Sequence, residues 1–215
     1  MRSIIILFAA TAAFSAETVT TPIDNDQVKV LNVVVQPHEK TRLHQHKINR
    51  VMIYLQAGRQ DFDYQDGKKS VLNFKAGEMK WSPSGGMHIA EITSNTSVNI
   101  IEVELKKPGT GSPASTSALD PVKGDKKHYK VELENDQVRV LRVKIGPHQS
   151  TPLHEHSLNR VVTYITDQDF RVTADGKEEM VKHKAGEVSW GTPTKHKEEN
   201  LSDKPFEVVV VELKN

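Results

Sequence analysis

Histidines occur at matching positions in the two halves of the chain, and this pattern constrains the fold more than any other feature. Of the ten histidines, eight form four pairs: His38 with His148, His44 with His154, His46 with His156, and His88 with His196. The surrounding sequence repeats as well, because PHEKTRLHQHKINR in the first half corresponds to PHQSTPLHEHSLNR in the second. Scattered surface histidines would not keep this register. The chain is therefore an internal duplication, and each copy carries its own group of histidines.

The duplication runs through most of the chain and predicts two domains. The turn sequences Asp-Gly-Lys and Lys-Ala-Gly-Glu occur once in each copy, and the two tryptophans, Trp81 and Trp190, are equivalent. We expect domains over residues 17–106 and 128–215, joined by a flexible linker over 107–127 that is rich in Gly, Pro, Ser and Thr. Domains of this size bury a limited core, so the two copies are expected to pack on each other.

The N-terminus predicts export. One basic residue, Arg2, precedes an apolar run from Ile4 to Phe14, and small residues surround Ala16. This pattern is typical of a secretory signal peptide, here residues 1–16, which is too short for a comfortable membrane span. The alternative is a buried N-terminal strand. No later segment is apolar enough to span a bilayer, so we expect a periplasmic or secreted protein without a membrane span after cleavage.

Cysteine content and charge exclude several classes of function. The chain has no cysteine, which excludes disulfides, thiolate metal sites and a cysteine nucleophile. Loss of Arg2 with the signal peptide leaves one basic residue fewer than the original 29, which equals the 28 acidic residues. Zero net charge argues against a nucleic-acid partner. Phosphate-binding loops, nucleophile elbows and dinucleotide fingerprints are also missing from the sequence.

Short apolar runs rich in β-branched residues predict an all-β fold. Examples are the runs from Val28 to Val35, Val51 to Leu55 and Val98 to Leu105, which turn sequences separate from one another. No long stretch has helical periodicity. Each copy is therefore expected to form an antiparallel sandwich or barrel.

The His-x-His pairs have the spacing of ligands on one strand face. Residues i and i+2 of a strand share a face, so His44 and His46 can point at one centre, and His88 reaches it from a distant strand after a Gly- and Pro-containing turn. The same parity places Arg50 and Tyr54 on that face. The second copy repeats this set with His154, His156, His196, Arg160 and Tyr164.

These motifs resemble those of the cupin (RmlC-like) superfamily, over nearly the whole of both copies. The first cupin motif, G-x5-H-x-H-x3-E, is matched by the two His-x-His pairs. The second motif, G-x5-P-x-G-x2-H-x3-N, is matched by Gly77, Pro83, Gly85 and His88 in the first copy, and by Gly186, His196 and Asn200 in the second. The resemblance implies a tandem bicupin with one double-stranded β-helix, or jelly-roll, barrel per domain.

The chain departs from the cupin pattern at the glutamate that usually completes a metal site. Arg50 and Arg160 occupy this position, and a guanidinium cannot ligate a metal. At about 4 Å, an arginine repels a divalent metal by several kcal/mol even at an effective dielectric constant near 20. Three alternatives follow: three histidines hold a divalent transition metal (Fe, Zn, Mn, Ni or Cu), His and Arg bind an anion without metal, or the histidines are relics of a metal-binding ancestor.

The arginines and tyrosines each have two interpretations. Arg50 and Arg160 clamp a ligand carboxylate, or they form internal ion pairs with an acid such as Glu102 or Glu198. Tyr54 and Tyr164 bind the ligand and are candidates for catalytic proton transfer, or they are core residues. Two further pairs are expected at the surface: His38 and His148 in turns, and Glu104 and Glu212 as solvated edge charges.

The sequence therefore predicts an exported bicupin that binds a small, anionic molecule in barrels lined by His and Arg, with a three-histidine metal site as an option. A first alternative is a metal-dependent cupin enzyme, a dioxygenase or isomerase acting on a small carboxylate. A second alternative is a structural bicupin with inert pockets. Both copies keep the His, Arg and Tyr set, which favours binding by both barrels. Homo-oligomers are compatible with every alternative.

Overall fold

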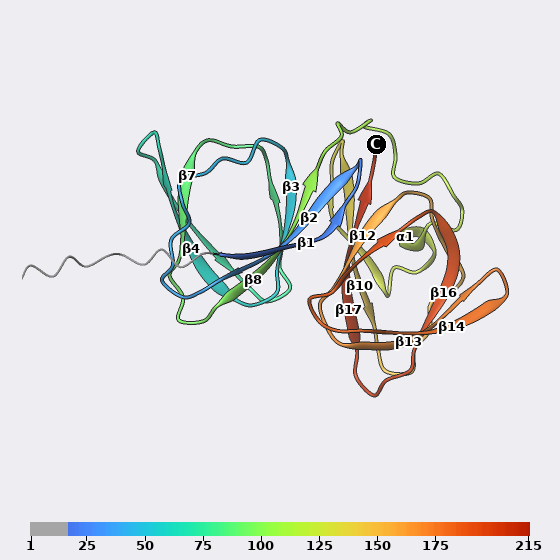
Figure 1. Ribbon diagram of the computed structural model, residues 1–215. Helices are drawn as coiled ribbons and strands as arrows, with labels where there is room; N and C mark the ends of the chain where they lie inside the picture. Colours follow the sequence, from blue (N-terminus) through green and yellow to red (C-terminus); the bar gives the residue numbers. More distant parts are fainter. Residues whose placement is uncertain (1–16) are drawn as a thin grey trace, which may run out of the picture.

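Strands make up nearly all of the regular structure in the computed structural model, which describes residues 17–215. Figure 1 shows two rings of strands side by side, one formed by each half of the chain. The all-β jelly-roll class predicted from the sequence is confirmed. The predicted signal peptide, residues 1–16, lies outside the described residues. Within the described part, no helix is long and apolar enough to cross a membrane.

The first barrel comprises eight antiparallel strands in two sheets. The strands are β1 (Thr18–Asp24), β2 (Val28–Val35), β3 (Arg50–Tyr54), β4 (Gly58–Tyr64), β5 (Lys69–Phe74), β6 (Met79–Ser82), β7 (His88–Ile92) and β8 (Val98–Leu105). One sheet has the order β1-β2-β8-β3-β6 and the other has the order β5-β4-β7.

The second barrel repeats this arrangement after a single short helix. Its elements are α1 (Pro121–Gly124), β9 (Tyr129–Glu134), β10 (Val138–Ile145), β11 (His154–His156), β12 (Arg160–Tyr164), β13 (Gln168–Ala174), β14 (Lys177–His183), β15 (Val188–Gly191), β16 (Thr194–Asn200) and β17 (Phe206–Leu213). The sheet orders are β15-β12-β17-β10-β9 and β11-β16-β13-β14. Only β11 lacks a counterpart strand, since the first barrel has a single bridge there, between His44 and His88.

The five-stranded sheets pack against each other and form a core between the barrels. Central strands such as β8 and β17 are buried on both faces, because one face lines their own barrel and the other meets the opposite barrel. This interface core consists of Val28, Val30, Val51, Ile53, Ile101, Val103, Leu105, Val138, Val140, Val161, Val209, Val211 and Leu213. Two smaller apolar clusters lie inside the individual barrels.

The contacts across this interface follow a pseudo-twofold symmetry. The Asn49 Nδ2 atom donates to Gln137 Oε1 at 2.6 Å, and the equivalent Asn159 Nδ2 donates to Gln27 Oε1 at 2.8 Å. Reciprocal contacts of this kind are the signature of an isologous interface. The two copies therefore pack like the subunits of a symmetric dimer.

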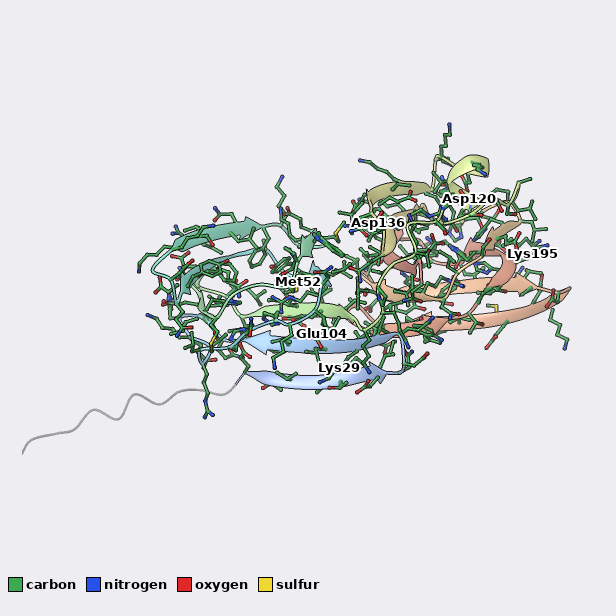
Figure 2. All side chains as sticks on the ribbon, turned by 90° about the horizontal axis from the view of Figure 1, so that it is seen from above. Lys29, Met52, Glu104, Asp120, Asp136 and Lys195 are labelled. Atoms are coloured by element: carbon green, nitrogen blue, oxygen red, sulfur yellow. The ribbon has the colours of Figure 1, made fainter. Side chains whose placement is uncertain are left out.

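The segment 107–127, expected to be a linker, contains α1 and contacts the second barrel. Asp120, at the beginning of α1 (Figure 2), is 1% exposed and pairs with Arg139 of β10 at 2.7 Å. The Thr110 backbone N–H donates to the Lys214 carbonyl at 2.8 Å. Part of this segment therefore belongs to the packed structure around the second barrel.

Substitution of Val103 by Ala is expected to lower the free energy of unfolding by about 2–3 kcal/mol, because it removes two buried methyl groups and leaves a cavity in the interface core. Val103 is 0% exposed, whereas Val71 is 52% exposed. The matched control Val71→Ala should change stability by less than about 0.5 kcal/mol. Urea denaturation measures both variants, and equal losses would show that the interface core is not a major source of stability.

Candidate metal centres

Three histidines converge inside each barrel. One ring nitrogen from each of His44, His46 and His88 lies within 4.8 Å of the others, and His154, His156 and His196 form the same arrangement. The third histidine is brought close by strand pairing, since His196 of β16 is the direct partner of His154 of β11. The three histidines of each copy converge as predicted, but only the second His-x-His pair lies on a strand, β11, whereas His44 and His46 lie outside the strands of the first barrel.

In the first barrel, His44 and His46 are part of a continuous chain of hydrogen bonds. Arg50 Nη1 donates to Glu102 Oε2 at 2.8 Å, and the same nitrogen contacts Nδ1 of His46. The Nε2 atoms of His46 and His44 are 3.0 Å apart. Nδ1 of His44 is 2.8 Å from the Arg42 carbonyl oxygen. The internal ion pair weighed for Arg50 is thus present, with Glu102 as its partner.

The direction of this chain assigns the protons on two imidazoles. A guanidinium only donates, so Nδ1 of His46 must accept from Arg50, and the ring proton of neutral His46 lies on Nε2. That Nε2–H donates to Nε2 of His44, whose own proton lies on Nδ1 and points to a carbonyl. The inward nitrogen of His46 therefore carries a proton, and the inward lone pair of His44 accepts it. His88 differs, because its Nδ1 donates to the Gly86 carbonyl at 3.1 Å and leaves Nε2 as an acceptor.

In the second barrel, a buried carboxylate orients the equivalent of His46. Nδ1 of His156 is 2.7 Å from Glu212 Oε1, and Arg139 Nε donates to Glu212 Oε2 at 2.5 Å. Glu212 is 0% exposed. Burial alone would raise the pKa of Glu212, but the hydrogen bonds from His156 and Arg139 hold it below its ordinary value. Because the carboxylate accepts the Nδ1 proton, Nε2 of His156 keeps its lone pair for the centre of the triad.

A tyrosine and a second carboxylate lie beside His154. The Tyr129 hydroxyl is 3.0 Å from Nε2 of His154 and donates to Glu198 Oε2 at 3.2 Å. Nδ1 of His154 is 3.0 Å from the Pro152 carbonyl oxygen, which accepts its proton. Burial and the nearby Glu198 carboxylate raise the pKa of Tyr129 well above its ordinary value, so the phenol keeps its proton.

The Arg160 guanidinium has different hydrogen-bond partners from that of Arg50. Its Nη1 donates to the Thr192 carbonyl at 2.6 Å, and within residues 17–215 no carboxylate oxygen lies within 4.0 Å of its guanidinium. Gly191 allows this conformation of the Arg160 side chain, since a Cβ at position 191 would lie 2.8 Å from Arg160 Cζ. The ion pair weighed between Arg160 and Glu198 is therefore not formed, although Arg160 still lines the second cavity.

Each barrel contains a cavity beside its triad, lined by all three histidines in the first barrel and by His156 and His196 in the second. The cavity volumes are ≈ 470 Å³ in the first barrel and ≈ 390 Å³ in the second. The candidate ligand-binding residues Tyr54 and Tyr164 line these cavities. Tyr54 stacks on Phe74 with ring centroids 4.0 Å apart, and Tyr164 stacks on His183 at 3.8 Å. Burial raises the pKa of both phenols, which suits packing and hydrogen bonding better than proton release.

Sequence reasoning misjudged one residue pair and missed others. The prediction that Glu104 and Glu212 are solvated edge charges is wrong for both. Glu212 is buried, because β17 turns it into the barrel together with Val208 and Val210. Glu104 is half-buried, and its carboxylate lies within 4.8 Å of ligand atoms of His46 and Glu102. Strand parity counted along β17 would have predicted that Glu212 faces the barrel interior. Tyr129 lies outside the repeated motifs and carries no such signal. His38 and His148 lie in exposed turns, as expected.

Comparison with known proteins identifies the fold. No protein-family model matches the chain, and no curated protein matches it. Among solved structures, AerE from Microcystis aeruginosa has a TM-score of 0.62 at 11% identity and covers 93% of this chain and 98% of its own.

Two further structural neighbours carry the same fold. A cupin 2 conserved barrel domain protein from Leptotrichia buccalis has a TM-score of 0.57 at 13% identity, covering 95% of this chain and 92% of its own. Oxalate decarboxylase from Bacillus subtilis, in a structure at pH 4.6, has a TM-score of 0.60 at 14% identity, covering 88% of this chain and 68% of its own. Likeness at these identities shows that the chain has the cupin fold.

The triads predict how stability depends on pH. Burial is the main cause that lowers the pKa of His46 to about 3, of His154 to about 4 and of His196 to about 3. The unfolded chain, with histidine pKa values near 6.5, therefore binds protons before the folded chain does. The free energy of unfolding of the metal-free protein should fall as the pH drops below about 6.5. Urea denaturation between about pH 7 and about pH 5 measures this slope.

The double variant His154→Gln with His196→Gln serves as the control for this pH dependence. It removes two of the buried imidazoles, so its stability should vary less with pH over the same range. An unchanged slope would mean that these histidines are not held neutral in the folded protein.

Proposed function

We propose that this chain is an exported tandem bicupin whose second barrel binds a divalent transition metal through His154, His156 and His196. The observation that carries the proposal is the Glu212–His156 hydrogen bond of 2.7 Å. Metal-binding histidines commonly donate their second ring N–H to a carboxylate, which fixes the tautomer and the ring orientation. The inward ring nitrogens of the second triad suit Mn, Fe, Zn, Ni or Cu. Export rests on the N-terminal sequence alone.

The donor set of the second barrel fits a metal with an open coordination position. The Tyr129 hydroxyl donates its proton to Glu198 at 3.2 Å, so Nε2 of His154 keeps a lone pair for ligation. Three histidines leave room for water or a ligand at the metal. A bound divalent metal would supply Lewis acidity toward a ligand oxygen. For comparison, oxalate decarboxylase from Bacillus subtilis, which shares the fold, has Mn(II) centres.

Arg160 gives the second barrel a preference for a small carboxylate. Its guanidinium lines the cavity and has no carboxylate partner within 4.0 Å among residues 17–215. Arginine holds carboxylates through two parallel hydrogen bonds. We therefore infer that the ligand is a small anion, with one oxygen directed to the triad and its charge balanced by Arg160.

Replacing Glu212 by Gln is expected to weaken metal binding by about 10–100-fold, because the neutral amide no longer fixes His156 as a carboxylate does. Glu104 occupies the equivalent position on β8, so Glu104→Gln is the matched control and should leave the affinity unchanged. Calorimetric titration of the metal-free protein with Mn(II) and Zn(II) measures both affinities. Equal losses in the two variants, or no binding by the folded wild type, would contradict the proposal.

A metal-dependent enzyme acting on a small carboxylate is the second candidate, favoured by the Tyr129–Glu198 pair beside His154. This pair could hold or move a proton next to a bound ligand. If so, Glu198→Gln should lower kcat by about 100-fold or more without loss of metal. Oxygen consumption and substrate loss, followed on a panel of small carboxylic acids that includes oxalate, measure the effect. Equal activity in the variant would exclude this role of Glu198.

A further inference from the structure

We propose that the first barrel is a metal-free pocket for an uncharged, largely apolar molecule that carries a hydroxyl group. This inference concerns the other barrel from the one that carries the proposed function, and it rests on that function only for the contrast between the two. It departs from the expectation that both triads bind the same kind of ligand. Three features of the first barrel carry it: its hydrogen-bond chain, its buried ion pair and its apolar walls.

The hydrogen-bond chain makes the first triad a poor metal site. Arg50 donates to Nδ1 of His46, so the proton of His46 lies on Nε2 and is given to His44. A metal at the centre would need the lone pairs of both Nε2 atoms, and it would also face the Arg50 cation. Removing these hydrogen bonds leaves the buried guanidinium with fewer partners, which is costly. Only His88 keeps an unengaged inward lone pair.

The buried ion pair makes the first barrel a poor anion site. Arg50 is 6% exposed and Glu102 is 7% exposed, and their atoms are 2.8 Å apart. The charge of the guanidinium is therefore already balanced, and Glu102 would repel a ligand carboxylate. Arg160 in the second barrel has no such partner among the described residues. The arginine at this position of the repeat is therefore neutralised by a carboxylate in the first barrel and available to a ligand anion in the second.

Apolar side chains make up the larger part of the first cavity's walls, although Glu17, Gln60 and Lys80 also line it. Tyr54 and Met52 of β3 line it, and Figure 2 marks Met52 within the first barrel. Other apolar residues that line it are Leu31, Val33, Phe62, Leu72 and Ile100. A volume of ≈ 470 Å³ accommodates a small molecule. Against these walls, Nε2 of His88 provides one acceptor, which a ligand hydroxyl can satisfy by donating its proton.

Binding of 2-naphthol to the full chain tests the ligand class, because its fluorescence reports transfer into an apolar pocket and it carries one hydroxyl group. The metal-free wild type should bind 2-naphthol and should bind 2-naphthoate, which has the same rings but a carboxylate, at least about tenfold more weakly in the first barrel. If the folded protein does not bind 2-naphthol, the proposal is wrong. A first barrel that prefers 2-naphthoate contradicts it equally.

A matched pair of histidine variants locates the bound probe. His88→Leu removes the acceptor and should weaken 2-naphthol binding by roughly three- to tenfold, the contribution of one hydrogen bond. The equivalent change His196→Leu should leave 2-naphthol binding unaffected and should abolish metal binding. If His196→Leu weakens 2-naphthol binding and His88→Leu does not, the pocket is in the second barrel and the proposal fails. His88→Gln, which retains an acceptor, gives a second test with a smaller expected loss.

The metal count tests the proposed exclusion of metal and separates this inference from the proposed function. The double variant Arg50→Gln with Glu102→Gln removes the ion pair as a unit and frees Nδ1 of His46 from the guanidinium. It should gain one bound Mn(II) or Zn(II) relative to the wild type, measured by elemental analysis after dialysis. A variant that stays at the wild-type count contradicts the exclusion mechanism. Absence of metal from the second barrel would contradict the proposed function, whereas the first-barrel inference would still be tested by 2-naphthol binding.

Discussion

Packing of the two five-stranded sheets against each other is the constraint on which the rest of the structure depends. Each barrel keeps a cavity in its interior, so neither can rely on a fully filled core of its own. The largest apolar cluster lies between the barrels instead. Strands β8 and β17 must therefore be apolar on the outer face, while their inner face is free to carry Glu102, Glu104 and Glu212. The same strands that join the barrels thus also supply the carboxylates of the two sites.

A duplicated backbone gives the two triads the same geometry, but their neighbours give them different chemistry. In the first barrel, an arginine contacts His46, and its charge is balanced by Glu102. In the second barrel, Glu212 accepts the proton of His156. Because a histidine carries its single ring proton on one nitrogen or the other, these neighbours decide whether the inward nitrogen donates a proton or offers a lone pair. Only a lone pair can bind a metal.

Much of the fold could be predicted from the sequence, because short β-branched runs, turn sequences and the repeat all indicate the same architecture. Strand parity predicted that His44 and His46 share a face, and the cupin-like second motif added His88 to them from a distant strand. The sequence raised the Arg50–Glu102 ion pair as one possibility, but the different contacts of Arg50 and Arg160 could not be predicted. They depend on a rotamer choice that Gly191 permits in one barrel, whereas Ser82 stands at the equivalent position in the other. Strand parity could have predicted the burial of Glu212, but its position on a terminal strand suggested an exposed edge.

The central claim is that the two barrels differ, with metal in the second and none in the first. Anomalous diffraction at the manganese absorption edge, from crystals grown with Mn(II), tests this most directly because it locates each ion within the molecule. We predict one strong peak among His154, His156 and His196, and none among His44, His46 and His88. Peaks of equal height in both barrels, or a peak in the first barrel alone, would contradict this claim.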